Sequence, residues 1–167
     1  PFVILDWEGP YQQVFYANII LDGLSKLKAT KAQEEEYKRI QGSALFFRAS
    51  ALFQLIQNFT KPYNTVTASK DPGIPVPLVS DVNERPGRGT LDQVYERIIL
   101  DLEESLPLLP QLSFYKSRPS KHAVMGMLAR LYLSMQRYDK AEFYAKACLA
   151  INATLIDYNT LNAGAVN

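Results

Sequence analysis

The sequence predicts an all-α fold, and three observations support this. The ten prolines are unevenly placed: none lies between Tyr11 and Lys61, none follows Pro119, and five crowd residues 62–86. Because proline lacks an amide donor and fixes φ, the long proline-free stretches are where helices can run. Apolar side chains recur at helical spacing in these stretches, and no segment alternates at period two for long enough to predict a sheet.

The first two helices are predicted over residues 10–28 and 32–58. Pro10 would lie in the first turn of its helix, where its missing amide hydrogen bond would be unmade anyway. The second helix begins with three glutamates, which are favourable at a helix N-terminus. Its centre, ALFFRASALFQLI, is apolar almost all round, so we expect neighbours on both sides. Arg48 and Gln54 are the polar interruptions.

Residues 60–89 are predicted to form an irregular insertion with one short extended piece, GIPVPL. At about thirty residues this segment is too long for a simple connector, and such loops are usually functional or disordered. Three further helices follow, over residues 90–106, 120–136 and 138–151. Thr90 opens the first of them with TLDQ, the form of a capping box in which the threonine and glutamine satisfy each other's end amides.

The last helix pair carries a tetratricopeptide-like signature. This repeat needs small residues where its two helices cross and aromatic residues beside them. The matching positions are Leu128, Ala129, Tyr132, Ala141, Ala145 and Cys148. Because a lone pair cannot bury both of its faces, the helices upstream strengthen the assignment. The chain is therefore predicted to be one α-helical scaffold over residues 1–167, built from helical hairpins.

Composition excludes several classes of function. The chain has 167 residues, with 18 Lys and Arg against 17 Asp and Glu, so it lacks the basic excess of a nucleic-acid binder. One Cys and one His leave no disulfide framework, zinc cluster or Cys–His pair. We find no nucleophile with a base and no pair of carboxylates across a cleft. We therefore expect no enzyme, no metal and no cofactor.

In order along the chain, the segments resemble the SusD/RagB family of outer-membrane nutrient-binding lipoproteins. The motifs that carry the resemblance extend from Trp7 to Asn159. They are YQQVFYANIILDGL, GSALFFRASALFQLIQNF, YNTVTASKDPGIPVPL, TLDQVYERIILDLEESLPLLP, SRPSKHAVMGMLARLYLSMQRYDKAEFYAKACL and LIDYN. The resemblance implies tetratricopeptide-like hairpins in a right-handed superhelix, with a long proline-rich insertion between the second and third helices.

The resemblance also implies a function and a location. It implies a non-catalytic protein at the surface of a Gram-negative outer membrane, which captures glycans or peptides for a SusC-like TonB-dependent transporter. Two features depart from the family pattern. Cys148 lies mid-helix and cannot be the lipid-bearing N-terminal cysteine, so the anchor is expected outside this chain. The variable second half of such proteins has no counterpart, so we expect a fragment of a longer protein, its scaffold portion.

Two aromatic residues are candidate ligand-binding residues. Trp7, the only tryptophan, precedes the predicted first helix, in a region that can supply an aromatic platform for sugars in the family. Tyr63 lies in the proline-rich insertion. Sugars stack on such rings through their C–H faces. The alternative for Trp7 is a packed aromatic side chain at a helix entry.

Two other functions remain open at this point. A soluble tetratricopeptide adaptor would bind a partner's peptide in a concave groove. Such adaptors usually keep short turns within a helix pair, whereas about thirty residues separate the second and third helices here. A hydrolase that uses residues outside this chain is the third possibility.

Overall fold

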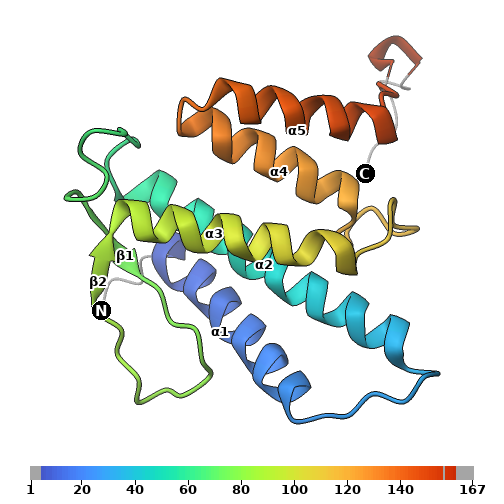
Figure 1. Ribbon diagram of the computed structural model, residues 1–167, viewed down its shortest axis with the longest axis horizontal. Coiled ribbons are helices and arrows are strands. Elements are labelled where there is room, and N and C mark those ends of the chain that lie inside the picture. Colours follow the sequence, from blue (N-terminus) through green and yellow to red (C-terminus); the bar gives the residue numbers. More distant parts are fainter. Residues whose placement is uncertain (1–4, 156, 161–167) are drawn as a thin grey trace.

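The computed structural model describes residues 5–155 and 157–160 (Figure 1). Its secondary structure is dominated by five α-helices: α1 (Leu5–Ser25), α2 (Glu34–Phe59), α3 (Leu91–Ser105), α4 (Lys121–Ser134) and α5 (Tyr138–Ile151). The shorter elements are the strands β1 (Pro72–Pro75) and β2 (Arg88–Thr90) and the 3-10 helices η1 (Leu106–Leu108) and η2 (Tyr158–Thr160). The all-α class and all five predicted helices are confirmed.

The helices pack as hairpins around α2. Figure 1 shows α1 antiparallel to α2, α3 on the other side of α2, and the α4–α5 hairpin stacked beyond α3. The core lies where α2, α3 and α4 meet, and its largest side chains are fully buried. They include Leu52, Leu55, Ile56, Ile98, Leu102, Leu128 and Leu131. The apolar centre of α2 is therefore sandwiched between neighbouring helices, as its sequence predicts.

The first helix begins earlier than predicted. α1 starts at Leu5 and ends at Ser25, so the expected span of residues 10–28 was wrong at both ends. Pro10 is buried inside the helix rather than in its first turn, and Trp7 lies within the helix rather than before it. A proline at this position removes the hydrogen bond to the carbonyl of Asp6 and crowds that carbonyl with its ring. The rings of Trp7 and Tyr11 pack together at a centroid distance of 4.8 Å and help to offset that loss.

The insertion is ordered and contains a short antiparallel ladder. Strands β1 and β2 pair with Pro72 opposite Thr90, and no sheet of three strands occurs among residues 5–155. Gly73 lies so close to β2 that a Cβ added there would come within 2.6 Å of the Thr90 carbonyl oxygen. The ladder ends at the start of α3, where the capping box between Thr90 and Gln93 is present as predicted.

The α4–α5 hairpin turns tightly. Gln136 adopts a left-handed φ of 59°, and the Arg137 amide donates to the Tyr132 carbonyl across the turn. The helices come close at small residues, since a Cβ added to Gly126 would lie 3.7 Å from the Cys148 sulfur. None of the helices in the described part of the chain is long and apolar enough to cross a membrane.

Candidate functional site

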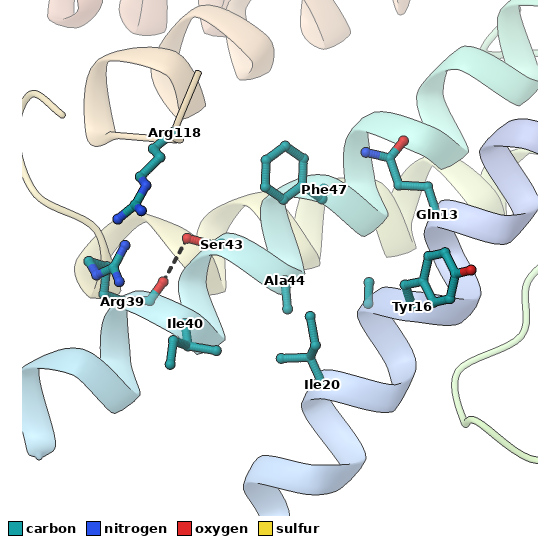
Figure 2. Close-up of a pocket in the computed structure, with 10 residues that line it drawn as sticks. Gln13, Tyr16, Ile20, Arg39, Ile40, Ser43, Ala44, Phe47 and Arg118 are labelled. Carbon is teal, nitrogen blue, oxygen red and sulfur yellow. Dashed lines mark hydrogen bonds between the residues drawn. The ribbon is translucent and has the colours of Figure 1, made fainter. Parts of the chain in front are cut away.

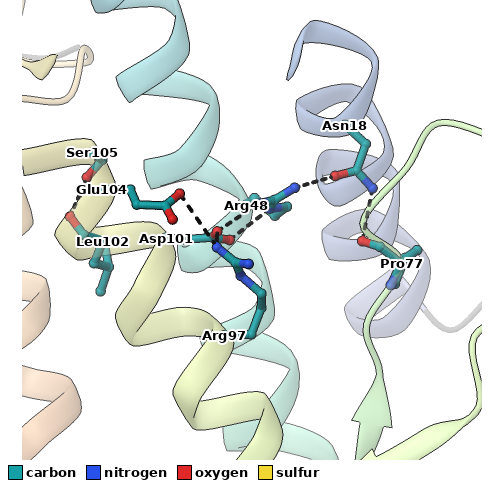
Figure 3. Close-up of polar contacts among 8 residues, drawn as sticks. All are labelled: Asn18, Arg48, Pro77, Arg97, Asp101, Leu102, Glu104 and Ser105. Atoms are coloured by element: carbon teal, nitrogen blue, oxygen red, sulfur yellow. Dashed lines mark hydrogen bonds and ion pairs between the residues drawn. The ribbon is translucent and has the colours of Figure 1, made fainter. Parts of the chain in front are cut away.

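A buried ion pair joins the two helices on either side of the core. The Arg48 guanidinium of α2 binds the Asp101 carboxylate of α3 through two hydrogen bonds, of 2.8 Å from Nε and 2.7 Å from Nη2 (Figure 3). The Asp101 side chain is completely buried, and it also accepts a hydrogen bond from Arg97 one turn earlier. An arginine at the centre of an apolar helix requires such a partner, because an unpaired buried charge is costly.

The same arginine reaches the insertion through Asn18 of α1. Arg48 donates to the Asn18 side-chain oxygen at 2.9 Å, and the Asn18 amide donates to the carbonyls of Pro77 at 3.0 Å and Val79 at 3.2 Å. Asn18 is fully buried, so its side-chain oxygen and nitrogen find their partners within the protein. A continuous polar chain therefore links α3, α2, α1 and the insertion (Figure 3).

Two more residues of α1 hold the insertion on either side of Asn18. The Tyr11 hydroxyl donates to the Pro75 carbonyl at 2.8 Å, and the Ser80 amide donates to the Asp22 carboxylate at 2.7 Å. Hydrogen bonds from the side chain and the amide of Ser80 lower the pKa of Asp22. Burial raises the pKa of Tyr11 well above its usual value. The segment 75–80 is thus fixed along α1 over nearly its whole length.

Trp7 packs where the start of α1 meets the end of α2. Its ring meets Phe59, the last residue of α2, edge to face at a centroid distance of 4.8 Å, and it also contacts Tyr11. The side chain is half-buried, so part of its surface faces solvent. The structure thus places Trp7 as a packed residue of the first helical turn with an accessible remainder.

Tyr63 lies just beyond the same end of α2 and is anchored to α3. Its hydroxyl donates to the Asp92 carboxylate at 2.7 Å, and its ring packs against Tyr95 at a centroid distance of 4.7 Å. Burial, followed by the bond to the Asp92 carboxylate, raises the pKa of Tyr63 to about 12. The two candidate residues therefore flank one end of α2, each held by a different aromatic neighbour.

A small cavity of about 140 Å³ opens beside Tyr63. Polar groups line it together with aromatic rings, and they include Gln57, Lys61, Tyr95 and Ser134. The cavity is smaller than the roughly 300–1,000 Å³ of a site that encloses a whole ligand, so it has room for one polar end of a larger ligand. Across the described residues, no group of three or more His, Cys, Asp or Glu side chains is placed to hold a metal ion.

Sequence reasoning missed the partners that orient Tyr63. Asp92 and Tyr95 both fall within the third predicted helix, residues 90–106, which was not linked to the insertion. Their spacing of three residues places both on one side of the first turn of α3, beside the returning loop. This spacing was the available signal.

Comparison with known proteins gives the family. Residues 2–133 match the SusD-like family described as "Starch-binding associating with outer membrane". No protein among the curated sequences matches the chain. A candidate sugar-binding protein from Bacteroides vulgatus is similar in structure, with a TM-score of 0.80 and 30% identity over 89% of this chain and 33% of its own. A SusD superfamily protein from Bacteroides thetaiotaomicron has a TM-score of 0.83 and 26% identity, over 94% and 35%.

A laminarin-binding SusD-like protein shares the fold at a TM-score of 0.69, with 20% identity over 85% of this chain and 29% of its own. The chain thus spans about a third of the length of the solved structures that it matches. The family match covers far more than half of the chain, and the hairpins superpose on those of its members. The chain therefore belongs to the SusD/RagB family of carbohydrate-binding, outer-membrane-associated proteins.

Proposed function

We propose that this chain is the helical scaffold portion of a lipid-anchored, non-catalytic protein that captures oligosaccharides at the cell surface for a SusC-like TonB-dependent transporter. The observation that carries the proposal is the family match over residues 2–133, with its starch-binding description. The sugar-binding description of the Bacteroides vulgatus protein, at 30% identity, supports the same ligand class.

The order of the insertion supports the proposal on physical grounds. A binding surface on a loose loop would lose affinity to the entropy of ordering it. Here α1 fixes residues 75–80 from three side chains, and α3 fixes Tyr63 through Asp92. The surface at this end of α2 is therefore already formed before any ligand binds.

We propose that Trp7 and Tyr63 contribute ring surface to the glycan site. Both are half-buried and held by neighbours, so their rings lose little freedom when a sugar stacks on them. One or two rings bind an oligosaccharide only weakly, and in the proposal the rest of the site lies in the longer protein.

Calorimetry against a panel of starch, laminarin and other glycan oligosaccharides tests this function. The longer protein should bind one member of the panel, and the 167-residue chain should bind the same glycan weakly or not at all. Trp7→Ala should weaken binding by the longer protein, whereas Phe143→Ala should not. Phe143 is the matched control because it is an exposed aromatic residue on α5, with 63% of its surface accessible.

Two results would count against the proposal. If chromatography showed that the purified protein releases shorter sugars from a glycan, an enzyme would be favoured. If the 167-residue chain bound peptides as tightly as the longer protein does and bound no glycan, a self-contained adaptor would be favoured. For the transporter, affinity purification of the tagged longer protein from outer membranes should recover a TonB-dependent receptor, and its absence would remove that part of the proposal.

A further inference from the structure

A groove of about 360 Å³ runs between α1 and α2, away from the insertion (Figure 2). Its floor is formed by Ala17 and Ala44, which are buried and whose side chains end at Cβ. Larger apolar side chains form the walls: Tyr16 and Ile20 on α1, and Ile40 and Phe47 on α2. Tyr16 is 54% exposed and Ile20 is 41% exposed, so the groove is open to solvent. We call it the α1–α2 groove.

One end of the α1–α2 groove is positively charged. Arg39 and Arg118 line that end, and Figure 2 shows their guanidinium groups beside each other. Arg39 is paired with Glu36, whereas Arg118 takes part in none of the ion pairs among residues 5–155 and lies over the Tyr115 ring, 5.1 Å from its centroid. The hydrogen bond from Arg39 lowers the pKa of Glu36, and the charge of Arg118 lowers it slightly further. Arg118 is therefore the cation at this end of the groove that has no carboxylate partner within that part of the chain.

The dimensions of the groove limit what can occupy it. Its lining extends over residues 13–20 of α1 and 39–47 of α2, which is about 10–12 Å along each helix axis. At about 1.2 Å per bond, as in an extended backbone, a straight chain of eight carbons spans about 8 Å and fits within this length. The middle of the groove offers only apolar walls, and the far end offers the Gln13 amide and the Tyr16 hydroxyl.

We propose that the α1–α2 groove binds a medium-chain aliphatic carboxylate, with its chain on Ala17 and Ala44 and its carboxylate on Arg118. Charge complementarity selects an anion, because Arg118 brings a planar donor fork without a carboxylate partner. The apolar walls select an alkyl chain, because burying it removes hydrocarbon surface from water. The acyl chain of a lipid ester carries no free carboxylate, so the free acid is the favoured form.

Octanoate and octan-1-ol form a matched pair of probes, which share a chain and differ in charge. Binding to the 167-residue chain is followed by the methyl NMR signals of alanine and isoleucine, which report on Ala17, Ile20, Ile40 and Ala44. Octanoate should shift these signals and should bind more tightly than octan-1-ol. A charge-assisted hydrogen bond accounts for about a tenfold difference in affinity.

Arg118→Gln should weaken the binding of octanoate about tenfold and leave the affinity for octan-1-ol unchanged. Lys116→Gln is the matched control, because it removes the same charge from an exposed residue of the same loop outside the groove. Ile20→Gln should weaken both probes. Because Arg118 and Ile20 are exposed or partly exposed, these variants should keep the helical circular dichroism of the parent.

Several outcomes would overturn the proposal. These are equal effects of the two charge variants, equal affinity for the two probes, or methyl shifts outside the α1–α2 groove. Absence of saturation at millimolar octanoate would do the same. Tighter binding of the peptide acid acetyl-Leu-Leu than of octanoate would reassign the groove to a peptide C-terminus. Glycan binding plays no part in this test, so it can fail or succeed independently of the proposed function.

Discussion

Replacement of Asp101 by Leu should destabilise the protein more than replacement of Arg48 by Met, although the two residues form one ion pair. The Asp101 carboxylate accepts from both Arg48 and Arg97. Without Asp101, the Arg48 guanidinium is 6% exposed and keeps only the side-chain oxygen of Asn18. Without Arg48, Asp101 still has Arg97.

The magnitudes follow from these remaining partners. Removing one member of a buried pair and stranding the other costs about 3–5 kcal/mol, which we expect for Asp101→Leu. Arg48→Met keeps the length of the side chain and leaves no unpaired charge, so we expect about 1–3 kcal/mol. The double variant should be more stable than Asp101→Leu, because it removes the stranded charge and Arg97 can turn to Glu104, 3.8 Å away.

Urea denaturation measures these differences, with helical circular dichroism and the fluorescence of Trp7 as two probes. The control is Glu104→Gln, which removes a half-exposed carboxylate on the surface side of the same arginine and should change stability little. If Arg48→Met proved as costly as Asp101→Leu, or if the double variant were the least stable of the three, the assignment of Arg97 as a second partner would be wrong.

Three further predictions concern the insertion and the last hairpin. Gly73→Ala should cost about 1–3 kcal/mol in urea denaturation because β2 leaves no room for a Cβ, whereas Gly87→Ala, with open space, should cost less than about 0.5 kcal/mol. Ala145→Trp should lower the thermal midpoint more than Glu142→Trp, since Ala145 is half-buried and Glu142 is exposed; equal shifts would refute the repeat register. The folded pKa of Asp22 is depressed, so its contribution is present above about pH 4 and lost as the pH falls below that value. The stability difference between the parent and Asp22→Asn should therefore shrink in acid, and a constant difference from pH 7 to pH 3 would contradict it.

The helices were predictable because their signals are local. The apolar stripe of α3 and its capping box lie within residues 90–105, and the structure reproduces both. The start of α1 was not predictable from the same rules, because Pro10 argues for a first turn at that position. What overrides the rule is tertiary: Trp7 packs on Phe59, 52 positions later in the sequence, and this contact holds the extra turn in place.

The buried ion pair between Arg48 and Asp101 could be predicted only in part. Arg48 interrupts an apolar helix, which indicates that it has a partner, but nothing near it in the sequence names Asp101, 53 positions away. The short strand β1 within the insertion shows the same limit. A strand that begins and ends with proline contradicts strand propensity, and β1 exists because Gly73 allows β2 to approach.

The prolines of the insertion explain how a segment outside the helices can be so firmly held. The backbone groups that α1 binds at positions 75, 77 and 79 are carbonyls, which accept hydrogen bonds from the side chains of Tyr11 and Asn18. Two of the three positions are prolines, which have no amide to satisfy and are already extended in the unfolded chain. At these positions a proline therefore sacrifices no hydrogen bond from a backbone amide, and it reduces the entropy cost of ordering the segment. Since α1 binds three carbonyls and the Ser80 amide, the backbone of the segment sets its course along the helix, while the side chain of Val76 packs against the core.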